Sequence, residues 1–238
     1  MLKSTLYKAQ KKVVKLSARK RQNAYFMEPG TGKSITSLAD VDQKQRRKNK
    51  QFLVLVVCPK NIIGSWEDEI ATHLTRASVQ IHLKQEIGEL PKEAQYHFVI
   101  TNYEQIRSKI DEYADLGWDY IILDESHRIK NRKAKTTKSV WHLDAPYKTI
   151  LSGTPITKDE IDLWAQYKWL NQSIGGNSFK LFEKEALTKV RVGDYFIVKP
   201  NKSRIKPFMN RASKFTHRLK LEDIAEIPPM SNIPVNLS

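Results

Sequence analysis

The chain has 238 residues, of which 40% are apolar, and this length suits one substantial domain or a domain with an appendage. Its longest apolar run, "FLVLVV" at 52–57, has the length of a buried strand and excludes a membrane-spanning or secretory segment of the usual kind. The formal charge is +15, and the single cysteine, Cys58, excludes internal disulfides and cysteine–zinc clusters, so we expect an intracellular protein of the reducing cytoplasm or nucleus.

Strand and helix patterns alternate as far as residue 171. Continuous runs of β-branched and aromatic residues predict buried strands at 23–27, 52–57, 97–101, 120–123 and 148–151, and a further one at 78–82. Apolar residues spaced by three and four predict helices within 6–16, 66–70, 106–113 and 161–167. "TKDE" at 157–160 has the form of a capping box that would begin the last of these helices. The alternation indicates an α/β fold with a parallel sheet flanked by helices.

The pattern weakens after residue 171. "LFEKEAL" at 181–187 predicts a short helix and "VRVGDYFIV" at 190–198 predicts a hairpin. The stretch that follows, up to Lys220, is basic and shows no clear period. "EIPPMSNIP" at 226–234 indicates an extended linker, because each proline disfavours helix in the residue before it.

"EPGTGKS" at 28–34 comes between a predicted strand and a predicted helix, which is the context of a phosphate-binding loop. Glycines let backbone N–H groups close on phosphate oxygens at the positive end of the helix, and Lys33 would neutralise the phosphate charge. Met27 stands where the strict pattern has its first glycine, and a glycine-rich turn with a surface lysine is the alternative. The residues that we expect to contact nucleotide here are Pro29, Gly30, Thr31, Gly32, Lys33 and Ser34.

"YIILDESH" at 120–127 supplies acidic groups at the end of another predicted strand. Asp124 and Ser34 are placed to hold Mg²⁺, and Glu125 to orient and deprotonate an attacking water. The alternative is a simple turn or helix start. Polar clusters follow each of the five strong strands, and the carboxyl ends of parallel strands meet at one edge of a sheet. We therefore predict one site, with Lys33, Asp124 and Glu125 as its catalytic residues.

Several motifs together resemble a known family. "MEPGTGKS", "DESH" and "SGTP", in this order, resemble the first core motifs of superfamily-two helicases, and more closely those of the Swi/Snf-type ATPases, which translocate on duplex DNA. "VVCPKNIIGSWEDEI", "TNYEQI", "DESHRIKN" and "LSGTPITKDEIDLW" match longer motifs of that family. In "DESH", Ser126 stands where alanine is usual in the family.

The resemblance implies a RecA-like P-loop fold and the use of ATP and Mg²⁺. It also implies that Gln10, in "LYKAQKKVVKL", contacts the adenine edge. Four residues would couple the nucleotide site to DNA, namely His127, Ser152, Gly153 and Thr154. His127 has the alternative of being a hydrogen-bonded core histidine.

Basic residues gather at the two ends of the chain. Residues 1–50 carry 14 Lys and Arg against three acidic residues, and residues 189–220 carry 10 against one. This distribution favours a polyanionic partner such as duplex DNA, although such charges are also ordinary on a solvated surface. The residues expected to contact the DNA backbone follow the strand ends: Lys60, Asn61, Asn102, Tyr103, Arg128, Lys130 and Asn131.

Family members carry a second RecA-like lobe with arginine fingers, so we expect a partner lobe beyond residue 238 or in another chain. We divide the sequence into an ATP-binding lobe at 1–171, a small basic protrusion at 172–222 and a linker at 223–238. Two other functions stay open. One is a different superfamily-two helicase or a restriction motor, and the other is a nucleotide-gated nucleic-acid-binding module without catalysis.

Overall fold

A computed structural model describes residues 1–82, 93–176 and 178–224 of the chain. The strands are β1 (Gln22–Met27), β2 (Phe52–Cys58), β3 (Ala77–Ile81), β4 (Tyr96–Asn102), β5 (Tyr120–Leu123), β6 (Tyr147–Ser152), β7 (Leu187–Val192), β8 (Tyr195–Pro200) and β9 (Thr216–Leu219). The α-helices are α1 (Lys8–Ser17), α2 (Lys33–Lys48), α3 (Ile63–His73), α4 (Tyr103–Ser108), α5 (Ile110–Ala114), α6 (Lys135–Val140), α7 (Asp162–Leu170), α8 (Gln172–Gly175), α9 (Phe179–Ala186) and α10 (Lys206–Ser213). Single 3₁₀ turns are η1 (Lys60–Ile62), η2 (Ser126–Ile129) and η3 (Leu221–Asp223).

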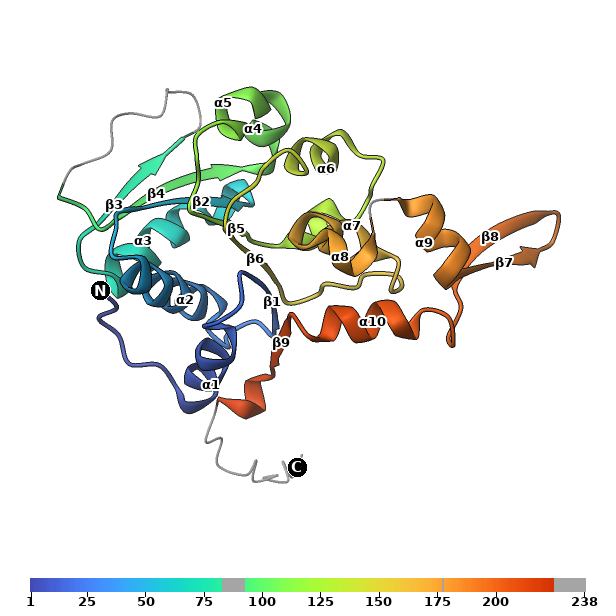
Figure 1. Cartoon of the computed structure of the whole chain (residues 1–238), viewed down its shortest axis with the longest axis horizontal. Coiled ribbons are helices and arrows are strands. Elements are labelled where there is room, and N and C mark those ends of the chain that lie inside the picture. Colours follow the sequence, from blue (N-terminus) through green and yellow to red (C-terminus); the bar gives the residue numbers. More distant parts are fainter. Residues whose placement is uncertain (83–92, 177, 225–238) are drawn as a thin grey trace, which may run out of the picture.

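Seven of the strands form one sheet, in the order β3-β4-β2-β5-β6-β1-β9, and every neighbouring pair is parallel. The carboxyl ends of all seven strands therefore lie along the same edge. β7 and β8 pair with each other as a separate antiparallel hairpin, which extends away from the sheet at one end of the molecule (Figure 1). The six strands predicted in the first part of the chain are confirmed, as is the hairpin.

Helices cover both faces of the sheet. Alternate residues of β2 show the division: Val54 and Val56 pack with α1, α2 and α3, whereas Leu55 and Val57 pack with helices α4 to α10. Both sets are fully buried, because a parallel sheet with helices on its two faces leaves neither side of a central strand in water. The continuous apolar runs of the sequence reflect this double burial.

One local prediction was wrong, and a strand was present where none was predicted. The capping box at 157–160 does not form, because α7 begins at Asp162, whose carboxylate accepts hydrogen bonds from the backbone N–H groups of Thr157 and Lys158. The basic stretch without periodicity contains α10 and then β9, which pairs with β1 at the edge of the sheet. No strand was predicted there, since β9 has four residues, of which only Leu219 is aliphatic.

A buried carboxylate fixes α2 to its neighbours. Asp40 accepts hydrogen bonds from Ser17 of α1, at 2.9 Å, and from Tyr120 of β5, at 2.6 Å. It also pairs with Lys44 one turn further along α2, and the side chains of this pair are 0% and 1% exposed. Burial lowers the pKa of Lys44, while the adjacent Asp40 opposes that change. Both charges are thus compensated inside the fold.

Lys44→Met is expected to lower the free energy of unfolding by about 3–5 kcal/mol, because it leaves the Asp40 carboxylate buried without its cation. Denaturant unfolding measures this change. Lys48→Met on the same helix is the control, since Lys48 is exposed and its removal should change stability by less than about 0.5 kcal/mol. An equal effect of the two substitutions would contradict the structural role of the pair.

His217 of β9 gives a pH-dependent stability. It is 6% exposed, lies 3.0 Å from Asn23 Oδ1, and its pKa is lowered to about 4 from 6.5, chiefly by burial and also by Lys20. Below pH 6.5 the unfolded chain binds a proton on this histidine that the folded chain does not bind. Stability should therefore fall between pH 6.5 and 4, by up to about 3 kcal/mol. His217→Gln should remove this part of the pH dependence in denaturant unfolding, whereas an unchanged profile would contradict it.

Candidate functional site

The loop between β1 and α2 has the backbone of a phosphate-binding loop. Gly30 and Gly32 have φ of 79° and 75°, values that side chains rarely allow. A Cβ atom at Gly32 would also lie 2.4 Å from the side-chain nitrogen of Gln10. The loop leads directly into the 16-residue helix α2, whose N-terminus favours anions. The Lys33 ammonium group donates to the carbonyls of Met27 and Glu28, at 3.1 and 3.4 Å, and so lies beside the loop.

Gln10 connects α1 to this loop. Its Nε2 donates to Thr31 O at 3.0 Å, its Oε1 accepts from Tyr7 N at 2.9 Å, and the residue is 3% exposed. The adenine contact that the resemblance implied therefore competes with two protein partners. These two hydrogen bonds hold the loop against the start of α1.

Asp124 follows the last residue of β5 and is 7% exposed. Its carboxylate accepts hydrogen bonds from Trp66 Nε1 and from Glu125 N, each at 2.8 Å. Burial raises the pKa of Asp124, while the Trp66 hydrogen bond and the positive charge of Lys33 act in the opposite direction. The sequence placed Trp66 in a predicted helix and in a motif of the family, without indicating its partner. Its link to Asp124 joins residues 58 positions apart, which no local pattern predicts.

Glu125 has a left-handed backbone, with φ of 49°, which is uncommon for a residue with a side chain. Its Oε2 lies 3.2 Å from His127 Nδ1 and accepts a longer hydrogen bond of 3.5 Å from Ser152 Oγ. Ser152 Oγ in turn accepts from Thr154 N at 3.1 Å. The "SGTP" motif is thus joined by a hydrogen bond to Glu125, which with Asp124 forms the acidic pair.

The serine that departs from the family pattern also has a partner. Ser126 is fully buried, and its hydroxyl donates to Gln166 Oε1 of α7 at 2.8 Å. Gln166 Nε2 donates to Pro155 O and Asp162 O, both at 2.9 Å. An alanine would leave Gln166 without this donor, so Ser126 adds a connection between η2 and the loop before α7.

The structure brings the predicted nucleotide residues to one edge of the sheet. Gly153 passes close to the phosphate loop, since a Cβ atom there would lie 3.4 Å from Pro29. No group of three or more His, Cys, Asp or Glu side chains suited to a metal occurs among the described residues. Mg²⁺ takes one or two carboxylates together with substrate phosphates and water. Ser34 at the start of α2 and Asp124 are the protein groups suited to it.

Four of the residues predicted to contact DNA line a common hollow of about 650 Å³ at the ends of β2, β4 and β5. We call it the strand-end hollow, and its lining is Lys60, Asn61, Asn102, Glu104, Gln105 and Arg128. Lys60, Asn61 and Arg128 are exposed. Arg128 Nη1 lies 3.9 Å from the Glu104 carboxylate, a separation that leaves the guanidinium available to other anions.

Four of the predicted DNA contacts, Asn102 of the hollow among them, form hydrogen bonds within the protein. Tyr103 is 2% exposed and its hydroxyl donates to Asp124 O at 2.6 Å, so it is a core residue and cannot reach a DNA backbone. Asn102 is 4% exposed and its Oδ1 caps α4 by accepting from Gln105 N. Lys130 donates to Thr157 Oγ1, and Asn131 is exposed with its Oδ1 on Lys133 N. Adjacency to a motif did not indicate which way these side chains point.

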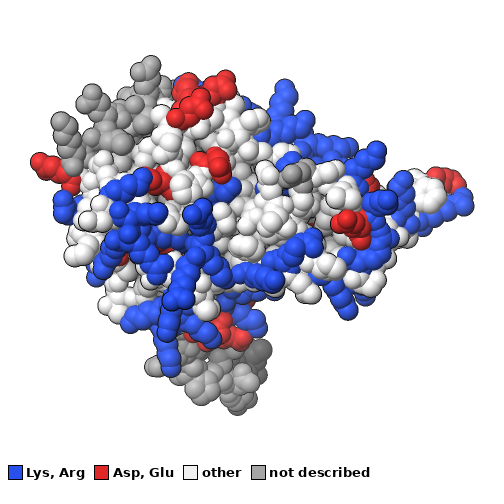
Figure 2. All heavy atoms as spheres, in the orientation of Figure 1, with Lys and Arg blue, Asp and Glu red and all other residues white. Residues whose placement is uncertain are grey.

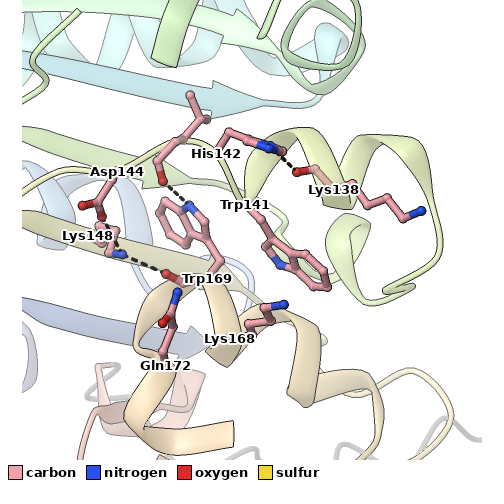
Figure 3. A pocket seen from close by; sticks show the side chains of 9 residues that line it. Lys138, Trp141, His142, Asp144, Lys148, Lys168, Trp169 and Gln172 are labelled. Carbon is pink, nitrogen blue, oxygen red and sulfur yellow. Dashed lines mark hydrogen bonds and ion pairs between the residues drawn. The ribbon is translucent and has the colours of Figure 1, made fainter. Parts of the chain in front are cut away.

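A second hollow, of about 860 Å³, lies near the amino end of β6, away from the nucleotide edge (Figure 3). Lys168 Nζ lies 3.9 Å from the centre of the Trp141 ring. Lys148 joins Asp144 to the carbonyl of Trp169, at 2.9 Å each. These lysines are engaged in packing α6 and α7 together, and none of the predicted site residues lies here.

The described part of the chain has no helix long and apolar enough to span a membrane. A family model described as "SNF2-related domain" matches residues 9–231. The TATA-binding protein-associated factor mot1 of Schizosaccharomyces pombe is 28% identical over 225 residues, which are 84% of this chain and 11% of that protein. The human SWI/SNF-related matrix-associated actin-dependent regulator of chromatin subfamily A member 1 is 25% identical over 216 residues, 88% of this chain and 20% of that protein.

The solved SWI2/SNF2 ATPase core of Sulfolobus solfataricus in complex with dsDNA superimposes with a TM-score of 0.76 at 23% identity. It covers 92% of this chain and 45% of its own, so the RecA-like fold predicted from the motifs is confirmed. The chain spans less than half of that core and a fifth or less of the two curated relatives.

Trp66→Phe is expected to raise the pKa of Asp124, because burial of the carboxyl remains while its indole donor is lost. It should also lower the free energy of unfolding by about 1.5–3 kcal/mol, the range for a hydrogen bond to a charged group. The Asp124 carboxyl ¹³C shift followed against pH measures the first effect. Trp118→Phe is the control, since its indole donates to Tyr113 O, a neutral acceptor, at 2.7 Å. An unchanged Asp124 pKa in Trp66→Phe would overturn the assignment.

Proposed function

The chain belongs to the SNF2-related domain family, and we propose that it is the ATP-binding lobe of a duplex-DNA-dependent ATPase of the Swi/Snf type. The observation that carries the proposal is the meeting of three motifs at one sheet edge. The Lys33 charge acts on Asp124, and Glu125 contacts Ser152 of the third motif. A purely structural turn has no need of this combination.

ATP binding would use the phosphate loop. Backbone N–H groups of residues 30–34 at the start of α2 would surround the phosphates, and Lys33 would exchange its two loop carbonyls for phosphate oxygens. Ser34 and Asp124 would hold Mg²⁺, which neutralises charge on the phosphate oxygens when bound. The buried Asp124 fits this role, because a nearby cation offsets the cost of keeping its carboxylate charged.

Glu125 would orient the attacking water and accept its proton. The Glu125 carboxylate is one third exposed, at 33%, so water reaches it, while His127 and Ser152 restrict its orientation. The proton on the water would pass to a Glu125 oxygen as the water oxygen attacks the terminal phosphorus, while the bond from that phosphorus to the bridging oxygen breaks and ADP leaves with the electron pair. His127, Ser152, Gly153 and Thr154 would then report the state of the nucleotide to the neighbouring strand ends.

Duplex DNA would lie across the strand-end hollow, with Lys60, Asn61 and Arg128 contacting the phosphate backbone and Lys130 and Asn131 extending this surface. Contacts of this kind position a duplex without reading its sequence, as translocation requires. Such a protein works where DNA and ATP are present, inside the cell in the cytoplasm or nucleus. The second RecA-like lobe would complete the ATP site from the opposite side.

We predict that the chain alone binds ATP–Mg²⁺ but turns it over about 10³-fold or more slowly than a complete two-lobe enzyme, because an arginine finger is worth at least that much. Binding is measured with a fluorescent ATP analogue and turnover by phosphate release, with and without duplex DNA. Lys33→Ala should abolish binding. Glu125→Gln should keep binding and lower any residual turnover by about 10²-fold or more.

Lys48→Ala is the matched control, since it removes an exposed lysine from the far end of the same helix. Turnover that duplex DNA stimulates strongly, and that Lys33→Ala abolishes, would mean that the chain builds a complete site by itself. Failure of the wild-type chain to bind ATP would contradict the proposed function. Stimulation by single-stranded DNA only would favour an unwinding helicase over a duplex translocase.

A further inference from the structure

α1 presents a row of lysines to solvent. Lys8, Lys11, Lys12 and Lys15, which we call the α1 lysine stripe, recur at the three- and four-residue spacing of one helical face. All four are exposed. The opposite face of α1 is buried through Gln10, Val13, Val14 and Ser17. The helix contains no acidic residue, so its outer surface carries positive charge only.

The stripe continues into a wider basic surface. Arg19 is exposed just beyond the end of α1, and Arg47 of α2 donates to Ala18 O in the same turn. Figure 2 shows Lys and Arg side chains concentrated over α1 and α2, with few acidic groups among them. α1 and α2 pack directly against each other, so the α1 stripe and the basic end of α2 belong to one continuous surface.

Several lysines elsewhere in the fold pair with carboxylates, whereas the stripe lysines pair with none in the described part of the chain. Within residues 1–82, 93–176 and 178–224, no hydrogen bond or ion pair occupies any of their four ammonium groups. Lys44, Lys50 and Lys148, in contrast, each pair with a carboxylate. Lysines three and four residues apart on a helix repel one another, and an interleaved acidic residue would relieve this. The stripe has no such acidic residue, so the repulsion between its lysines remains.

The position of the stripe separates it from the strand-end hollow. α1 packs beside β9 and β1, since both α1 and β9 line a hollow of about 380 Å³. β1 is separated from β2 by β6 and β5, whereas the strand-end hollow lies beyond β2, β4 and β5. Val13 and Val14 of α1 are buried against the fold, and Leu16 is the one large apolar side chain that the helix exposes, so α1 has no broad apolar face to insert into a lipid surface.

We propose that the α1 lysine stripe is a second contact surface for the phosphate backbone of duplex DNA. From Lys8 to Lys15 the helix rises about 10 Å, which matches about three base-pair steps of one strand. The four ammonium groups form a row of point charges along one helical face, which suits a regular array of phosphates better than an acidic peptide. This inference rests on the proposed function for the identity of the polyanion, and it adds a contact that the motif residues do not provide.

The first test is the salt dependence of binding to a fluorescein-labelled 20-base-pair duplex, followed by anisotropy. Each phosphate contact contributes about 0.9 to the slope of log K against log salt concentration. Lys11→Gln with Lys15→Gln should therefore lower the slope by up to about 1.8, and substitution of all four lysines by up to about 3.6. Arginine at the same four positions should restore the wild-type slope, because the phosphate contact needs charge and not a particular side chain.

The matched control is Lys180→Gln with Lys184→Gln on α9, at the other end of the molecule (Figure 1). These two lysines are exposed and have the same four-residue spacing as Lys11 and Lys15. Each double substitution removes two positive charges, so the two variants have the same net charge. The α9 pair should leave the slope unchanged. An equal fall in slope for the two pairs would show general electrostatic attraction and would overturn the proposed site.

A proximity measurement gives an independent answer. Cys58 is fully buried, so a thiol-reactive photocrosslinker attached to Lys11→Cys labels one chosen position. Crosslinking to the duplex should occur from residue 11 and not from Lys180→Cys. No crosslink from residue 11, under conditions where the protein is saturated with DNA, contradicts the proposal.

Variants of the strand-end hollow distinguish a failure of the proposed function from a failure of the proposed α1 contact. If Arg128→Ala with Lys60→Gln weakens duplex binding while the stripe variants keep the wild-type slope, the proposed function stands and the stripe is only a solvated face. If the wild-type chain binds ATP but no duplex DNA, the proposed partner and this inference fail together. The proposal requires that both sets of variants weaken binding and that both leave ATP binding unchanged.

Discussion

One buried carboxylate holds together the elements that carry the proposed nucleotide site. Asp40 of α2 is bound by Ser17 of α1, by Tyr120 of β5 and by Lys44, and all of these groups lie within the closed interior. These same elements carry Gln10, the phosphate loop and the acidic pair. A charge that is buried in this way is tolerated only with complete partners, so the relative positions of α1, α2 and β5 are restricted by the cost of losing any of them.

This restriction matters because the side chains of the proposed site are attached where a helix begins or a strand ends. Lys33 is the first residue of α2, and Asp124 is the first residue after β5. A shift of α2 along the sheet would therefore change the distance between the lysine and the acidic pair directly. The hydrogen bond from Trp66 adds α3 to the same assembly, which makes Asp124 dependent on the packing of helices on one face of the sheet.

The sequence predicted a structural feature correctly where a single short segment determines that feature. Strands buried on both faces need continuous apolar residues, and the glycines of the phosphate loop stand where positive φ is required, so both could be predicted. β9 could not, because its place beside β1 comes from tertiary packing of a short polar segment. The partners of Trp66 and Ser126 lie 58 and 40 positions away in the chain. The burial of Tyr103 also escaped prediction, since a motif fixes position along the chain but not the direction of a side chain.

That buried tyrosine has a consequence for how the two proposed surfaces relate. Tyr103 is the first residue of α4, and its hydroxyl holds the carbonyl of Asp124. The neighbouring residues Asn102, Glu104 and Gln105 line the strand-end hollow. If α4 is displaced and this hydrogen bond is kept, the Asp124 backbone must move with α4. If the displacement breaks the hydrogen bond, the Tyr103 hydroxyl and the Asp124 carbonyl are left buried without partners. Tyr103 is therefore one side chain that connects the border of the strand-end hollow to the Asp124 backbone, beside the contacts of Glu125 with His127 and Ser152.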